Sequence, residues 1–179
     1  MKTSFFSALL ISVLLGGCAA TSKPPEASTF DVISTNYHAA DCLLQPLRLV
    51  PSRPLIVATL VNVDALGESS RMGRMFSEQI ASRFTHKGYQ VIELKLRENL
   101  FMKSSEGELM LSREVRDVSR VHQAQAVIVG TYAASSDKVY LNLKTVEPSS
   151  SVVLSAHDYA VPLDSNVRSL LGGRSRYSY

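Results

Sequence analysis

The chain has no tryptophan, only two cysteines and no strong excess of either charge. Two cysteines in 179 residues exclude a small domain held together by disulfides. The 19 basic and 16 acidic side chains give a formal net charge of +3. They are spread along the chain, whereas a dedicated nucleic-acid binder usually carries a basic stripe. The composition also excludes a collagen-like repeat and a polytopic membrane protein.

What remains is the composition of a globular protein. Apolar residues make up 45% of the chain and charged residues 20%, which argues against disorder over most of its length. A chain of 179 residues is long enough for one domain and leaves little for a second.

The N-terminus has the features of a bacterial secretion signal. Lys2 supplies a positive charge and residues 5–15 form a mostly apolar run, which is too short to cross a bilayer because a spanning helix needs ~20 residues. The following Leu15-Gly16-Gly17-Cys18 resembles the lipobox of bacterial lipoproteins. The alternative is an ordinary signal peptide with an incidental cysteine, but a cysteine placed directly after Leu-Gly-Gly favours lipidation at Cys18.

Lipidation at Cys18 predicts where the mature protein is found. The small residues at positions 16 and 17 let the chain enter a peptidase cleft, and the thiol of Cys18 takes up diacylglycerol. Two or more acyl chains hold a protein stably on a membrane. Ala19 stands where inner-membrane lipoproteins of enteric bacteria typically carry aspartate, so we expect attachment to the outer membrane, on its periplasmic face. Residues 18–29 are small, polar and proline-bearing, which predicts a flexible lipidated tether.

Hydrophobic periodicity predicts one α/β (α+β) domain over residues 30–171. Apolar residues at helical spacing predict helices at 30–47, 67–87 and 112–123 and a short one at 163–171, and apolar or alternating runs predict strands at 55–63, 89–96, 126–132, 139–146 and 152–161. After an N-terminal helix, the order is β-α-β-α-β-β-β. Strands joined through helices lie parallel and the last pair is antiparallel, so we expect a mixed sheet of about five strands flanked by three or four helices. Residues 1–17 are then the signal peptide, and 172–179 a flexible tail.

Patterns that carry chemistry are missing from the sequence. The four histidines lie in separate predicted elements, and no HExxH, CxxC or GxSxG pattern occurs. Residues 67–73 lie between a strand and a helix but lack the pattern of a phosphate-binding loop. We therefore expect no catalytic residue, no metal site, no cofactor and no enzymatic activity.

Two features leave alternatives open. Cys42, the second cysteine, could form a disulfide between chains, but burial as a small apolar residue is favoured. Arg113, Arg116 and Arg120 form a basic ridge on the third predicted helix. The ridge could meet an acidic partner, although a solvated helix face is favoured.

Three motifs together carry a resemblance to a known family. They are GR-x3-EQ-x-ASR at 73–83, LSR-x-VRD at 111–117 and AQAVIVGTY-x9-NLK at 124–144. In this order they resemble the flagellar outer-membrane lipoprotein FlgO family, and the resemblance extends over about residues 54–163. It implies a structural role near the flagellar rings at the outer membrane, with FlgP- and FlgT-like partners, and a requirement for motility. The family brings no catalytic residues, so Cys18 is the one functional position it transfers.

The resemblance and the residues together predict a non-enzymatic outer-membrane lipoprotein that is a structural component of the flagellar rings, or a factor for their assembly or stability. We expect self-association in a ring through the final two predicted strands, at 139–146 and 152–161, because an unshielded strand edge can pair with another chain, and we expect Tyr140 and Lys144 of the alternating strand at 139–146 to be exposed. The alternative is an envelope lipoprotein that binds and regulates a peptidoglycan-synthesis or secretion machine. Neither hypothesis requires nucleic acid or a small-molecule substrate.

Overall fold

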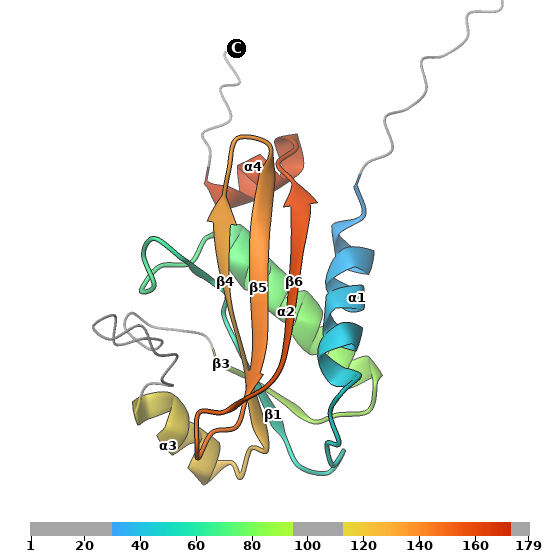
Figure 1. Ribbon diagram of the computed structural model, residues 1–179, viewed down its shortest axis with the longest axis vertical. Helices are drawn as coiled ribbons and strands as arrows, with labels where there is room; N and C mark the ends of the chain where they lie inside the picture. The colour runs from blue at the N-terminus through green and yellow to red at the C-terminus, as the bar shows by residue number, and fades with distance from the viewer. Residues whose placement is uncertain (1–29, 95–112, 173–179) are drawn as a thin grey trace, which may run out of the picture.

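Four helices and six strands follow one another in the computed structural model, which describes residues 30–94 and 113–172 (Figure 1). Their bounds are α1 Val32–Leu44, β1 Leu55–Ala58, β2 Val61–Asn62, α2 Arg71–His86, β3 Val91–Leu94, α3 Arg113–Val121, β4 Ala126–Ala134, β5 Lys138–Val146, β6 Val153–Pro162 and α4 Ser165–Leu171. The helix starts follow side-chain chemistry. Asp31, Ser70 and Asp164 each accept a hydrogen bond from a backbone N–H in the first turn of α1, α2 and α4. Gly88, at φ +88°, follows the end of α2 in the left-handed conformation that favours glycine.

The strands form one mixed sheet in the order β3-β1-β4-β5-β6, with β2 paired to β4. β1 is parallel to both β3 and β4, whereas β4, β5 and β6 form an antiparallel meander. The predicted fold class and the predicted strand directions are confirmed. A sixth strand arises because the run at 55–63 breaks after Ala58. The backbone N–H of Leu60 donates to Ser77 Oγ at 2.8 Å, and Leu60 O accepts from Ser69 Oγ at 2.6 Å, so this residue is bound to α2 and to the segment before it.

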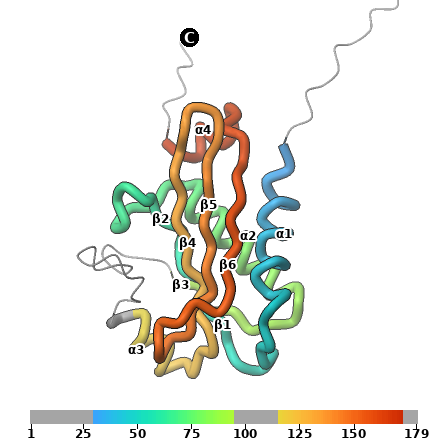
Figure 2. The backbone as a smooth tube through the Cα atoms, viewed as in Figure 1, coloured from blue at the N-terminus to red at the C-terminus, as the bar shows by residue number. Residues whose placement is uncertain are grey.

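The two faces of the sheet are covered unequally. α1, α2 and α4 pack on one face, where the larger core contains Phe76, Ile80 and Phe84 of α2 and Leu43 of α1. The tube in Figure 2 shows α1 and α2 running side by side next to the meander. On the other face, a smaller core gathers beneath α3 around Val115.

Two points of the packing differ from what local spacing predicts. Helical spacing after Val115 and Val118 predicts Val121 or His122 on the inward face of the third helix, but Val121 is 75% exposed, because α3 ends there and the chain turns at Gln123, at φ +52°. The buried position is Ser119, whose hydroxyl donates to the Val115 carbonyl at 2.6 Å. Of the final two strands, which were expected to present an unshielded edge, β5 lies between β4 and β6 and is hydrogen-bonded on both sides, so the edge belongs to β6. The ends of the sheet order are β3 and β6.

Candidate functional site

The predicted lipidation residue, Cys18, lies outside the described residues. So do the rest of the tether at 18–29, the signal peptide at 1–17 and the chain beyond Gly172. None of the helices in the described ranges has the length and apolar character needed to cross a membrane. The structure therefore describes the folded domain. Two of its features are a group of polar contacts between two helices and a face of the sheet that is open to solvent.

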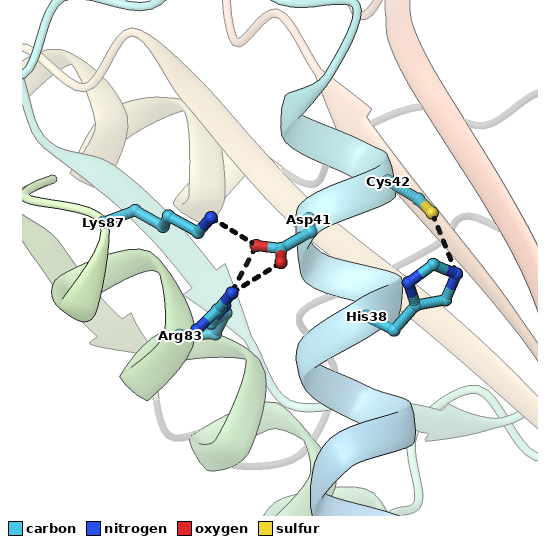
Figure 3. A network of polar contacts seen from close by, with 5 residues as sticks. All are labelled: His38, Asp41, Cys42, Arg83 and Lys87. Atoms are coloured by element: carbon cyan, nitrogen blue, oxygen red, sulfur yellow. Dashed lines mark hydrogen bonds and ion pairs between the residues drawn. The ribbon is translucent and has the colours of Figure 1, made fainter.

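A cluster of charged side chains joins α1 to α2 (Figure 3). Asp41 of α1 accepts hydrogen bonds from Nε and Nη2 of Arg83 at 2.9 and 2.6 Å, and its other contact is with Lys87 Nζ at 3.3 Å. Hydrogen bonding to Arg83 and Lys87 holds the pKa of Asp41 below its ordinary value of 3.8, against an opposing effect of burial. The Arg83 guanidinium also lies 5.4 Å from the centre of the Tyr37 ring. These contacts fasten the two helices together.

Cys42 and His38 lie on another side of α1 from this cluster (Figure 3). The Cys42 thiol is free and half-buried, with Sγ 3.6 Å from Nε2 of His38. The expectation that Cys42 is buried is therefore wrong: its neighbour Leu43 takes the buried position. The ring of His157 stands edge-on to His38, with centroids 6.2 Å apart. Within residues 30–94 and 113–172, no three His, Cys, Asp or Glu side chains are placed so that they could hold a metal ion.

A hydrogen-bond relay connects three elements through Asn36, which is 0% exposed, to the half-buried side chains of Gln79 and Tyr159. The Tyr159 hydroxyl of β6 donates to Asn36 Oδ1 at 2.5 Å, and Asn36 Nδ2 donates to Gln79 Oε1 of α2 at 2.6 Å. Burial raises the pKa of Tyr159, so this hydroxyl keeps its proton and remains a donor. Sequence reasoning missed the relay. The available signal was a single asparagine among the apolar positions of the first predicted helix.

The outer face of the meander is open to solvent. Figure 1 shows β4, β5 and β6 in front with α2 behind them, and none of the described helices covers this part of the face. Tyr140 of β5 is 54% exposed and Val63 is 47% exposed, and both line a shallow hollow of about 520 Å³. Asn142 of β5 donates to Asp158 of β6 on the same face. Tyr140 is exposed as expected, whereas Lys144, on the same face, is half-buried.

The basic ridge of α3 is described in part. The side chain of Arg113 is outside the description, Arg116 is half-buried, and Arg120 is exposed and pairs with Asp117 at 2.9 Å. An ion pair three residues apart on one helix neutralises part of the ridge within the helix itself. This favours the solvated face over a dedicated surface for acidic partners.

Comparison with known proteins identifies the fold and then the family. The C-terminal domain of LpoB from Salmonella enterica has a TM-score of 0.51 and 12% identity, covering 70% of this chain and 93% of that one. The same domain from Escherichia coli has a TM-score of 0.50 and 12% identity, covering 74% and 98%. The three domains share a fold. The FlgO protein family matches residues 37–166, so this chain belongs to the FlgO family. No curated protein matches the sequence.

Proposed function

We propose that this protein is a non-enzymatic outer-membrane lipoprotein that is a structural component of, or an assembly or stability factor for, the flagellar rings near the outer membrane. The match to the FlgO family over residues 37–166 is the observation that carries the proposal. The Leu15-Gly16-Gly17-Cys18 sequence supports the lipid anchor. The contacts found around Asp41 and Asn36 hold helices and strands together, as a structural module requires.

A lipid anchor gives such a module a physical advantage. Confinement to a plane raises the effective concentration of each copy for its neighbours without any new contact. The flagellar rod passes through these rings and has rotational symmetry. Copies arranged around it can make head-to-tail contacts that close into a ring. Flagellar envelope proteins of the FlgP and FlgT kind are the partners expected beside it.

We place the contact between copies on the open face of the meander. The face exposes the apolar surface of Tyr140 and Val63 beside charges of opposite sign, Lys144 and Asp158. A second copy can cover the apolar surface and pair these charges. The backbone of β5 is already paired on both sides, so a strand-edge contact between copies could use only β6 of these two strands.

The anchor is tested by replacing Cys18 with serine at the native locus. Cys42→Ser is the matched control, because it removes the other cysteine and leaves the predicted anchor site unchanged. We expect mass spectrometry to find acyl chains on wild-type protein and on Cys42→Ser, and none on Cys18→Ser. We also expect Cys18→Ser alone to leave the membrane fraction and to reduce swimming. Normal swimming with the unanchored protein would contradict the proposal.

Deletion of the gene separates the proposal from its alternative. Loss of a flagellar component reduces swimming and removes density from the basal body at the outer membrane, with cell shape unchanged. Loss of a regulator of peptidoglycan synthesis alters cell shape or antibiotic sensitivity. Electron cryotomography of basal bodies, together with cell-shape measurement in the same strain, distinguishes the two.

The open face is tested by Tyr140→Lys combined with Lys144→Glu. Ile33→Lys is the control, because Ile33 is 53% exposed on α1, which packs on the opposite face of the sheet. We expect the double variant to fold, to reach the membrane and to lose ring density and swimming, while the control keeps both. Ring density that is unchanged in the double variant would remove this face from the assembly.

A further inference from the structure

A hollow of about 390 Å³ lies where β1 and β3 end, on the side from which α2 begins. Val57 of β1 and Met75 of α2 give it apolar lining, and four charged side chains lie around it: Arg71, Arg74 and Glu78 of α2 and Glu93 of β3. Its volume is in the range of small-molecule sites. The hollow is therefore small, partly apolar and bordered by both signs of charge.

The topology of the chain predicts a binding crevice at this place. β1 and β3 are adjacent and parallel. The helix that follows β1 packs on one face of the sheet, whereas the helix that follows β3 packs on the other. In open sheets of this type, ligands bind outside the carboxyl ends of two such strands, where the connections diverge to opposite faces.

The four charges remain available to a ligand. Arg71 Nη2 donates to the Ser169 carbonyl at 2.6 Å and Arg74 Nη1 donates to the Ser69 carbonyl at 3.1 Å, so each guanidinium keeps further N–H donors. In the part of the chain that the structure describes, the ion pairs join Asp41 to Arg83 and Lys87, and Asp117 to Arg120. None of them joins an arginine of the hollow to Glu78 or Glu93.

Some residues of the motif GR-x3-EQ-x-ASR make packing contacts, and others border this hollow. Gln79 and Arg83 bind residues of α1. Gly73 allows a close backbone approach, since a Cβ there would lie 2.5 Å from Leu60 O. The other two charged positions of the motif, Arg74 and Glu78, border the hollow. Packing contacts thus explain Gly73, Gln79 and Arg83 of the motif, and the remaining charged residues, Arg74 and Glu78, border the hollow.

We propose that this hollow binds a small zwitterion, an amino acid or short peptide that carries both a carboxylate and an ammonium group. Arg71 and Arg74 bind the carboxylate, because guanidinium groups form the strongest hydrogen bonds that a carboxylate receives. Glu78 and Glu93 accept hydrogen bonds from the ammonium. A ligand with negative charge alone meets two carboxylates here, and one with positive charge alone meets two guanidinium groups, so a molecule with both charges is favoured over either.

Methionine methyl groups report binding directly. Met75 lines the hollow, while Met72 is 0% exposed in the core and is an internal control. Full-length protein with ¹³C-methyl methionine, purified in detergent, is titrated with glycylglycine, with acetate and with ethylamine, and Met75→Leu assigns the signal. We expect glycylglycine to shift the Met75 resonance with a Kd about tenfold below that of either singly charged probe, and Met72 to stay in place.

Charge-removing variants then identify the two ends of the ligand. Arg74→Gln and Glu78→Gln are each expected to weaken glycylglycine binding about fivefold or more, while the exposed Arg53→Gln, outside this hollow, leaves it unchanged. No Met75 shift with the dipeptide, equal binding of acetate, or full binding by both variants overturns the proposal. Because the readout is binding in solution, this result is independent of any effect on motility.

Discussion

Asp41 of α1 and Arg83 of α2 meet through two parallel hydrogen bonds, from Nε at 2.9 Å and from Nη2 at 2.6 Å. The two side chains are about one third exposed, at 32% and 28%. A two-point contact of a guanidinium with a carboxylate fixes the angle between the helices as well as their distance. Since α1 covers part of the core beneath β6, this pair helps to close the apolar face of the sheet.

Asp41→Asn is predicted to lower the melting temperature by about 1–3 °C at neutral pH, because it removes the charge from a partly exposed ion pair. The pKa of Asp41 is lowered in the folded protein, so its stabilising effect is present above the ordinary value of 3.8 and is lost as pH falls through the lower folded value. The difference between wild type and variant should therefore shrink below pH 3.8. Calorimetry at pH 6 and at pH 3 or lower measures both quantities.

Glu68→Gln is the control for this series, since Glu68 is an exposed carboxylate away from Arg83. We expect its melting temperature to follow wild type across the same range. A difference between wild type and Asp41→Asn that stays constant down to low pH would show that the charge of Asp41 has no part in stability.

Asn36→Ala is predicted to lower the free energy of unfolding by more than the loss of a few side-chain atoms would suggest. It removes a side chain that is 0% exposed and leaves the Tyr159 hydroxyl and the Gln79 amide carbonyl without their partner. Buried polar groups that lose a partner cost about 1–3 kcal/mol each, so we expect the free energy of unfolding to fall by about 2 kcal/mol or more. Urea denaturation measures it.

Tyr159→Phe separates the relay from simple packing. It removes one donor and keeps the ring, so we expect a smaller loss, about 1 kcal/mol. Adding Tyr159→Phe to Asn36→Ala should cost less than the sum of the single effects, because the two residues share a hydrogen bond. Strict additivity would contradict the relay.

Sequence periodicity was sufficient to predict the main helices and strands and the face that each of them buries. The apolar steps at Phe76, Ile80 and Phe84 place one face of α2 in the core, and the alternation along β5 buries Val139, Leu141 and Leu143 on one side, as observed. These patterns are local, because each element buries one face of its own period. The alternation does not say which strands flank β5, and its interior place in the sheet was therefore missed.

Contacts between distant residues could not be read from local pattern. The break after Ala58 depends on the hydroxyls of Ser69 and Ser77, which follow nine and 17 residues after Leu60. The relay joins Tyr159 to Asn36 over a separation of 123 residues. The half-buried state of Cys42 likewise depends on how α1 sits against its neighbours, and periodicity alone had favoured burial.

Gly73→Ala is predicted to destabilise the protein although it lies within α2. In an exposed helix interior this change stabilises by about 1 kcal/mol. Here a Cβ would lie 2.5 Å from Leu60 O, 2.5 Å from Ser69 Oγ and 2.9 Å from the Tyr132 ring. Backbone must move to admit it, so we expect a loss of about 1–3 kcal/mol. Ser82→Ala, at an exposed position of the same helix, is the control and should be neutral or slightly stabilising. Stabilisation by both changes would show that the close approach is absent.

Thr145→Val is predicted to stabilise the protein. Thr145 is 1% exposed on β5, between Ile128 of β4 and Ser155 of β6, and within the described residues its Oγ1 has no hydrogen-bond partner. Valine has nearly the same shape and removes the unpaired hydroxyl, so the free energy of unfolding should rise by about 1 kcal/mol, with a melting temperature about 2–4 °C higher. Thermal denaturation followed by circular dichroism measures the change.

Ser77→Ala is the matched control for Thr145→Val, because it removes a buried hydroxyl that is fully engaged. Ser77 Oγ accepts from the Leu60 N–H and donates to the Gly73 carbonyl, each at 2.8 Å. Its loss leaves the buried N–H of Leu60 unpaired, and we expect a fall of about 1–3 kcal/mol. The two changes each delete one buried hydroxyl and should act in opposite directions. If Thr145→Val also lowers the melting temperature, its hydroxyl is bound in the folded protein and this region of the sheet contains a partner for it.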